Sequence, residues 1–313
     1  MQHAVGADTT QFASANIFPR KDTATVVALN TRPDEGQLTA SELWRAVKED
    51  RVIALYHPQV DLATGHTVAV ETLARIIDDR GKLIAPGRFI AEAEASGVIV
   101  PLGRTVLQKA CQALAGWRAA GVGLRRVCVN LSSLQLNLDP TLARFAVRTA
   151  ETHNLKLADI EFEISEQQLL NADPVASATI DELLDLGGRL AIDDFEGRQR
   201  TITTQLEHDV HVVKLDPSIV SRLPDEPMAR LLARRAVVLA QDAGLDIVAE
   251  RVETPGQIEF LRSIGCDRAQ GYVYTRPVPG TLVPKFLRFS KLGADVEPGS
   301  HSATLGRSRL PAC

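Results

Sequence analysis

The chain has 313 residues, of which 45% are hydrophobic and 24% charged, and its formal net charge is −4 at pH 7. This composition fits a globular protein long enough for one large α/β domain or two smaller ones. The mild charge balance argues against nonspecific binding to duplex DNA, and no apolar run reaches the roughly 18 residues of a membrane span.

The N-terminal part of the chain predicts a tail followed by a hairpin. Residues 1–37 show no lasting period, so we expect a poorly ordered extension with one short element at 23–30. The first residues lack the basic stretch and apolar core of a secretory signal, and we therefore expect a cytoplasmic protein. Apolar runs at 52–62 and 67–76 are separated by a four-residue turn, which predicts two paired strands.

Helix-like and strand-like segments then alternate. A helical stretch over about 86–120, broken near Pro101, has stop signals at Gly97 and Gly121. Strands are predicted at 126–133, 160–166, 189–195, 210–216, 246–253 and 269–277. Helices are predicted at 140–154, 174–186, 201–208, 227–243, 255–264 and 281–291. This alternation predicts an α/β fold, a (β/α)8 TIM-like barrel over residues 38–289, with a flexible tail at 290–313.

The cysteines and two neighbouring histidines predict no zinc site. Cys111, Cys128, Cys266 and Cys313 are far apart and match no zinc spacing, so we expect reduced thiols. His208 and His211 have the spacing of a ligand pair, but no third nitrogen or sulfur ligand lies near them in the sequence. Surface or packing roles are therefore favoured for both histidines.

Each predicted strand carries an acid, an amide or a lysine near its C-terminal end. These residues are Glu71, Asn130, Glu163, Asp193 with Asp194, Lys214, Glu250 and Gln270. A polar residue at one strand end is commonplace, but seven successive strand ends argue against coincidence. In a barrel, these ends converge on the rim where active sites of this architecture lie. The pattern therefore predicts an active site there.

Five carboxylates on one rim would repel one another, and divalent cations would remove that penalty. Oxygen ligands with one amide favour Mg²⁺ or Mn²⁺ over zinc. Adjacent aspartates such as Asp193 and Asp194 can serve two ions, with one carboxylate bridging them. Two ions would clamp the attacking and leaving oxygens of a phosphate displacement, so we expect phosphodiester hydrolysis.

These residues and motifs resemble those of the EAL-domain phosphodiesterases of bacterial cyclic-di-GMP signalling. The resemblance covers roughly residues 40–288, and Glu71-Thr72-Leu73 stands where the family has Glu-Ala-Leu. The segment "YHPQVDLATGHTVAVETLAR" is similar to the family's opening segment, and "VAERVETPGQIEFLRSIGCDRAQGYVYTRP" also follows the family's spacing. The resemblance implies a barrel with one antiparallel strand that hydrolyses cyclic-di-GMP to linear pGpG.

The resemblance also implies roles for single residues. The implied ligands are Glu71, Asn130, Glu163 and Asp193 for a first ion, and Asp193, Asp194 and Glu250 for a second. Lys214 resembles the lysine that holds or deprotonates the attacking water, so the expected catalytic group is Lys214 with Glu250 and Glu71. The remaining implied residues are Arg75 at a substrate phosphate, Gln270 near the site, Pro86 and Phe89 at a guanine-binding surface, and Glu166 as an anchor for the loop after Asp194.

Three features depart from the family pattern. Residues 196–201 read Glu-Gly-Arg-Gln-Arg-Thr where the family has Gly-Thr-Gly-Tyr-Ser-Ser, Thr72 replaces alanine, and Arg251 replaces glycine. In the family this loop links metal binding to dimer contacts. Two readings therefore stay open: an active phosphodiesterase, and a weak or inactive module that binds cyclic-di-GMP or a regulatory protein. A third reading is an unrelated barrel lyase or aldolase with a Schiff base on Lys214.

Overall fold

The structure is a computed structural model that describes residues 37–197 and 208–289. Both predicted terminal extensions, the short element at 23–30 and the helix near 201–208 therefore lie outside the described residues, apart from Gln37 and His208. Within the described ranges, no helix combines the length and the apolar character needed to cross a membrane.

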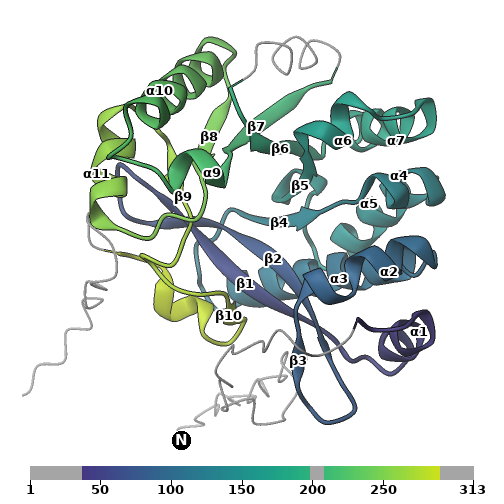
Figure 1. The fold of residues 1–313 in the computed structure, drawn as a ribbon. Coiled ribbons are helices and arrows are strands. Elements are labelled where there is room, and N and C mark those ends of the chain that lie inside the picture. Colours follow the sequence, from purple (N-terminus) through teal and green to yellow (C-terminus); the bar gives the residue numbers. More distant parts are fainter. Residues whose placement is uncertain (1–36, 198–207, 290–313) are drawn as a thin grey trace, which may run out of the picture. The chain divides into compact units, whose positions relative to one another are not determined.

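The described chain alternates strands and helices (Figure 1). The strands are β1 (Val52–Asp61), β2 (Thr67–Ile77), β3 (Leu83–Ile84), β4 (Arg126–Asn130), β5 (Ile160–Ser165), β6 (Arg189–Phe195), β7 (Val210–Leu215), β8 (Asp246–Ala249), β9 (Arg268–Ala269) and β10 (Val278–Pro279). The α-helices are α1 (Ala40–Lys48), α2 (Ile90–Ala95), α3 (Ile99–Ala119), α4 (Ser133–Leu138), α5 (Leu142–Thr152), α6 (Glu166–Leu170), α7 (Pro174–Asp185), α9 (Pro217–Val220), α10 (Pro227–Asp242) and α11 (Pro255–Ser263). Three 3₁₀ helices are η1 (Pro86–Arg88), η2 (Leu157–Asp159) and η3 (Val283–Phe286).

Eight strands close into a ring in the order β1, β9, β8, β7, β6, β5, β4 and β2, with β2 paired back to β1. Strand β1 is antiparallel to both of its neighbours, and the other pairings in the ring are parallel. The short strand β3 pairs with the C-terminal end of β2, and β10 pairs with the middle of β1 at Leu55 and Tyr56. The prediction of a (β/α)8 TIM-like barrel with one antiparallel strand is confirmed.

Helix starts in this barrel follow local capping chemistry. Asp173 precedes α7, and its side chain accepts from the backbone N–H groups of Val175 and Ala176. Thr254 and Gln257 form a capping box at the start of α11. In both helices a proline occupies the first position, where a missing N–H is harmless. These caps satisfy backbone donors that would otherwise lack partners, so the helices begin where the sequence predicts them.

Apolar packing joins the helices to the outside of the barrel, and α3 is the clearest case. This helix contacts β1 and β4, and its Trp117 is buried against Tyr56 of β1 with ring centroids 4.8 Å apart in an edge-to-face arrangement. The indole Nε1 of Trp117 donates to the carbonyl oxygen of Gly280 over 2.9 Å. A buried ring with a satisfied N–H fixes α3 and the segment after β10 to the same strand.

The inward-facing side chains form layers along the barrel axis. Ala191, Val212 and Val248 make a small buried apolar cluster. Side chains two residues apart on a strand share a face, so the residues two positions further along these strands, Asp193, Lys214 and Glu250, face the same interior nearer the C-terminal rim. Strand alternation thus carries the polar residues into one mouth of the barrel.

Three element predictions are wrong in detail. Pro101 lies in the first turn of α3, and the break falls instead at Gly97, whose φ is +75°. The strand expected at 269–277 overlaps the observed β9 (Arg268–Ala269) only at Ala269, because Gly271 packs directly on the backbone of Val252 and the chain turns there. The closing helix expected at 281–291 is the short η3.

Candidate functional site

Lys214 lies at the centre of a group of carboxylates in the barrel mouth. Its Nζ is 2.9 Å from Oε2 of Glu163, 2.7 Å from Oε1 of Glu250 and 3.4 Å from Oδ2 of Asp193. Only 1% of the lysine side chain is exposed. Strands β5, β6 and β7 and the end of β8 each supply one member, so the predicted meeting of strand ends takes place here.

Glu71 forms the second half of the site. Oε1 accepts a hydrogen bond from Nδ2 of Asn130 over 2.9 Å, and Oε2 accepts one from Nε2 of Gln270 over 2.5 Å. Glu71 lies inside β2 and not at its end, because β2 continues past it to pair with β1 and β3. The carboxylate of Glu71 nevertheless reaches the parallel strand ends, since it accepts from Asn130, the last residue of β4.

The adjacent aspartates are separated by an unusual backbone conformation. Asp194 has φ +56°, in the left-handed region, and its N–H donates to Oδ1 of Asp193 over 2.9 Å. The pairing between β6 and β7 is irregular between Ile192 and Phe195. Asp193 therefore reaches Lys214 inside the mouth, while Asp194 is exposed. Burial, followed by the charges of Asp193 and Asp216, raises the pKa of Asp194.

The carboxylates outnumber the cation that contacts them. Within 37–197 and 208–289, Lys214 is the one cationic side chain that pairs with Glu163, Asp193 and Glu250. Burial alone would lower the pKa of Lys214, but these carboxylates and Glu71 raise it well above its ordinary value, so the ammonium stays charged.

Burial and the surplus of carboxylates raise the pKa values of two of the acids, Glu163 and Glu250. Burial, together with the neighbouring carboxylates, raises the pKa of Glu163 well above its ordinary value despite the attraction of Lys214. The same causes raise the pKa of Glu250 to about 7. Glu71 behaves oppositely: burial raises its pKa, but Lys214, Asn130 and Gln270 together lower it below the ordinary value. Glu71 is thus more readily kept ionised than Glu163 or Glu250.

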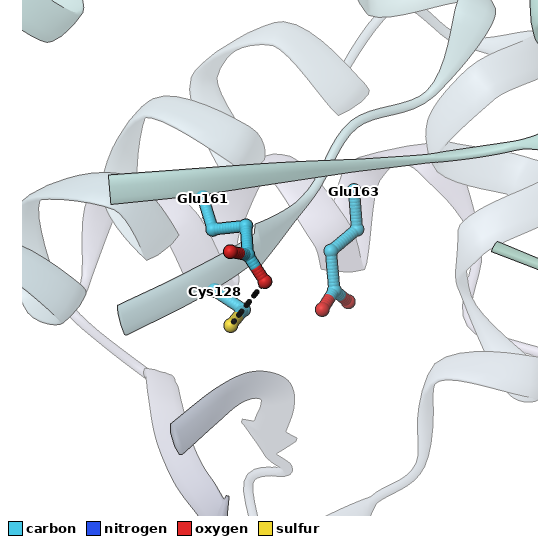
Figure 2. Close-up of side chains that lie close together, drawn as sticks. All are labelled: Cys128, Glu161 and Glu163. Carbon is cyan, nitrogen blue, oxygen red and sulfur yellow. Dashed lines mark hydrogen bonds between the residues drawn. The ribbon is translucent and has the colours of Figure 1, made fainter. Parts of the chain in front are cut away.

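One layer deeper, Cys128, Glu161 and Glu163 form a second group of buried side chains (Figure 2). One ligand atom from each lies within 4.8 Å of the others, which is a spacing that can hold a metal ion. The Cys128 thiol, however, donates to Oε1 of Glu161 over 3.6 Å, and Arg268 lies 3.6 Å from the same oxygen. Arg268 thus supplies positive charge to Glu161. Of these three residues, Glu163 is the one that also contacts Lys214 in the mouth.

Comparison with protein families shows which family this barrel belongs to. The model of the EAL domain matches residues 40–277. The chain belongs to the EAL domain family. The predicted family is therefore confirmed, and the match covers the described barrel from α1 to the turn before β10.

Two named relatives are about 30% identical to this EAL domain over the aligned residues. Cyclic di-GMP phosphodiesterase PdeR of Escherichia coli is 29% identical over 262 residues, which cover 82% of this chain and 39% of that protein. Cyclic di-GMP phosphodiesterase NbdA of Pseudomonas aeruginosa is 32% identical over 253 residues, which cover 81% of this chain and 32% of that protein. The chain spans 33% to 42% of the length of the first curated relatives it matches.

Solved structures agree with this placement. The PaMucR phosphodiesterase in complex with c-di-GMP has a TM-score of 0.72 and 28% sequence identity. That likeness covers 78% of this chain and 98% of the other. The barrel and its family are thus supported by both sequence and structure.

The other residues predicted for the site, beginning with Arg75, lie in different elements of the EAL domain. Arg75 lies four residues after Glu71 on β2, and its guanidinium donates to the carbonyl oxygen of Ala74 over 2.8 Å. Burial lowers the pKa of Arg75, while Tyr272 and Glu71 oppose that effect. Arg75 is therefore close enough to Glu71 to feel its charge.

Pro86 and Phe89 lie in the segment between β3 and α2, and Glu166 lies at the start of α6. Pro86 begins η1 and is partly exposed, whereas Phe89 is buried behind it and supports that segment from the core. Glu166 is buried at the start of α6, directly after Ser165, which pairs with Asp193. That position suits a residue that contacts the chain after β6.

The departures from the family pattern fall at two described places. Arg251 directly follows Glu250 and has φ +50°, a conformation that glycine adopts without strain. Thr72 is buried on the outer side of β2, and its hydroxyl has no hydrogen-bond partner among the described residues. In the altered loop, Glu196 and Gly197 are described, while residues 198–201 lie outside the described residues.

Two residues near the site were not predicted from the sequence. His57 of β1 pairs with Glu71 in register, and its Nδ1 lies 2.9 Å from Nε2 of Gln270. Tyr272 is 50% exposed, and the guanidinium of Arg276 stacks on its ring at 4.4 Å. Symmetric pairing of 52–62 with 67–76 places Thr72 opposite His57, and the observed register, with its bulge between Gln59 and Val60, brings Glu71 there instead. Tyr272 was not predicted because its segment was expected to be a strand.

Proposed function

We propose that this EAL domain hydrolyses cyclic-di-GMP to linear pGpG with the help of divalent metal ions. The observation that carries the proposal is the surplus of carboxylates over Lys214 in the mouth of a barrel of this family. The likeness to the PaMucR phosphodiesterase in its c-di-GMP complex supports the substrate.

The donor set fits hard divalent cations. Carboxylate oxygens face the mouth from Glu71, Glu163, Asp193 and Glu250, and Oε1 of Glu163 is buried without a hydrogen-bond partner among the described residues. An unpaired buried carboxylate oxygen beside other carboxylates is stabilised by a cation. Oxygen donors favour Mg²⁺ or Mn²⁺. We assign Glu71, Asn130, Glu163 and Asp193 to one ion and Asp193, Asp194 and Glu250 to a second.

The reaction adds one water to a cyclic phosphodiester. The water oxygen bonds to phosphorus, the bond from phosphorus to a ribose 3′-oxygen breaks, one proton of the water passes to the site, and the 3′-oxygen takes up a proton. Bound divalent ions supply Lewis-acid stabilisation of the phosphate oxygens and a more acidic water.

The residues of the chain divide the remaining work. Nζ of Lys214 lies 2.9 Å from Glu163 and 2.7 Å from Glu250, so we assign Lys214 to holding the water or a phosphate oxygen in the mouth. Glu250 belongs to the assigned catalytic group with Lys214 and Glu71, and its Oε1 lies 2.7 Å from Nζ of Lys214. Arg75 is assigned to a substrate phosphate, and Pro86 with Phe89 to the guanine side of the site. Gln270 holds Glu71 in place over 2.5 Å.

The test is incubation of the purified chain with cyclic-di-GMP and either Mg²⁺ or Mn²⁺, with pGpG separated by chromatography. We expect product that depends on the added metal and that falls by orders of magnitude in Glu71→Ala. Glu151→Ala, at an exposed glutamate of α5, serves as the matched control and should keep the activity. Absence of pGpG from the unaltered chain with both metals would overturn the proposed activity.

A second candidate function is a binding module without turnover. Arg251, beside Glu250 in a left-handed conformation, favours this reading, as does the altered loop at 196–201. Calorimetry with cyclic-di-GMP and Ca²⁺ distinguishes the two candidates when combined with the product assay. Tight binding without any pGpG in Mg²⁺ or Mn²⁺ would support the module.

We further propose a homodimer that also presents a surface to a regulatory protein. The exposed side of α10 carries Met228, Leu231 and Val238, each more than half exposed, at helical spacing. An apolar stripe of this kind on a helix supports a protein contact. Sedimentation of the unaltered chain and of Leu231→Asp tests the dimer, and identical monomer masses would contradict it.

We also propose a cytoplasmic location. Cys111, Cys128 and Cys266 are free thiols in the described part of the chain. Free thiols are usual in a reducing compartment.

A further inference from the structure

A line of hydrogen bonds runs from the turn after β9 to Glu71 through His57. Nε2 of His57 lies 3.0 Å from the carbonyl oxygen of Thr275, and Nδ1 lies 2.9 Å from Nε2 of Gln270. The same amide nitrogen lies 2.5 Å from Oε2 of Glu71. His57 is 8% exposed and Gln270 3% exposed, so water competes little for these bonds.

The chemistry of the groups fixes the direction of each bond. A carbonyl oxygen only accepts, so Nε2 of His57 carries the hydrogen and Nδ1 of the neutral ring is an acceptor. Burial lowers the pKa of His57, which agrees with a neutral ring. The carboxamide nitrogen of Gln270 then donates one hydrogen to His57 and the other to Glu71. A hydrogen on Nδ1 would instead point at the amide N–H of Gln270, and the hydrogen bond between His57 and Gln270 would be lost.

We propose that His57 is a positioning residue for Glu71, acting through the carboxamide of Gln270. The acceptor Nδ1 selects the orientation in which Gln270 turns its nitrogen, and not its oxygen, toward the carboxylate. Because Asn130 holds Oε1 of Glu71 and Gln270 holds Oε2, the plane of the carboxylate is fixed from both sides. The proposal rests on the proposed function, since Glu71 is a ligand and catalytic group only in that reaction.

The same orientation leaves Oε1 of Gln270 as a fixed acceptor. This oxygen is buried and has no hydrogen-bond partner among the described residues. A buried amide oxygen held in this way offers a hydrogen-bond site to a donor hydrogen of the substrate or of a water. Loss of His57 would let the carboxamide turn over, so that its oxygen would face the oxygens of Glu71 and repel them.

The experiment compares His57→Leu, which has no acceptor, with His57→Gln, whose side-chain oxygen can accept from Gln270. Partners that orient a metal ligand typically contribute 10- to 100-fold, so we expect His57→Leu to lower kcat by about 10- to 100-fold with a smaller change in KM. His57→Gln should recover most of that loss. His153→Leu, at the end of α5, is the matched control and should leave the kinetics unchanged.

A second measurement keeps the test independent of folding and of turnover. Nitrogen-15 NMR of the unaltered chain should show His57 with hydrogen on Nε2 and a bare Nδ1 at neutral pH. A ring protonated on Nδ1, or a His57→Leu variant with unchanged kcat, would overturn the positioning role. If the proposed function is wrong, the unaltered chain makes no pGpG. The NMR measurement still tests the positioning role in that case, because it determines which ring nitrogen of His57 carries the hydrogen.

Discussion

Glu250 should make the folded protein less stable as the pH rises through the weakly acidic range. Burial first, and then the charges of Asp193 and Glu71, raise its pKa from 4.5 to about 7 against the attraction of Lys214. The folded carboxyl group therefore holds its proton more tightly than the unfolded one. Stability from this group is complete below pH 4.5 and is lost as the pH rises through about 7.

The size of the effect follows from the two pKa values. At about 1.4 kcal/mol for each pH unit, the difference between 4.5 and about 7 corresponds to ~3 kcal/mol of unfolding free energy. The side chain is 14% exposed, so solvent screening leaves most of this value in place. Glu250→Gln stays neutral at every pH. The unfolding free energy of Glu250→Gln minus that of the unaltered chain should rise by ~3 kcal/mol between pH 4.5 and pH 8.

Urea unfolding followed by circular dichroism, with EDTA to remove divalent ions, measures both chains at each pH. The quantity compared is how the difference in unfolding free energy between the two chains changes with pH. Any effect of removing the carboxylate from Lys214 that does not depend on pH cancels in this comparison. Glu151→Gln, at an exposed site on α5, controls for a surface charge and should track the unaltered chain. If Glu250→Gln and the unaltered chain differ by the same amount at every pH, the reasoning about this carboxyl group is refuted.

Two further substitutions test the backbone and the cation of the site. Arg251→Gly should raise the unfolding free energy by about 1 kcal/mol, since φ +50° strains a residue with a Cβ, and calorimetry should show a higher Tm. An unchanged or lower Tm would count against strain at this position. Lys214→Met should lower the unfolding free energy by about 3–5 kcal/mol at pH 8, because it leaves buried carboxylates without their cation. The deficit should shrink at pH 5, where those carboxylates take up protons, and equal deficits at both pH values in urea unfolding would contradict the explanation.

The sequence predicted the site where parallel strands determine it. Glu163, Asp193, Lys214 and Glu250 lie at or near the C-terminal ends of successive parallel strands, and those ends meet in any closed barrel. No register had to be known for that prediction. The four side chains accordingly meet around one ammonium group.

Contacts that depend on register or on close packing were not predictable in the same way. His57 lies on the antiparallel strand, so its place opposite Glu71 depends on hairpin pairing that shifts by a bulge between Gln59 and Val60. After β9 the chain turns at Gly271, which lies so close to the backbone of Val252 that a Cβ there would collide with it. Alternation of apolar residues carries no information about such approaches, so the segment after β9 was predicted as extended.

The acid-rich rim led to the expectation that only divalent ions make such crowding tolerable, and the structure refines that argument. Lys214 already balances one charge among Glu71, Glu163, Asp193 and Glu250, and protons on Glu163 and Glu250 can balance more. Crowding alone therefore does not require a metal, because raised pKa values offer an alternative way to relieve it. Protons and divalent cations compete for the same oxygens in such a group. The acid-rich mouth is thus a place where metal occupancy, pH and folding stability depend on one another, and Glu250 is the member whose pKa places that dependence near neutral pH.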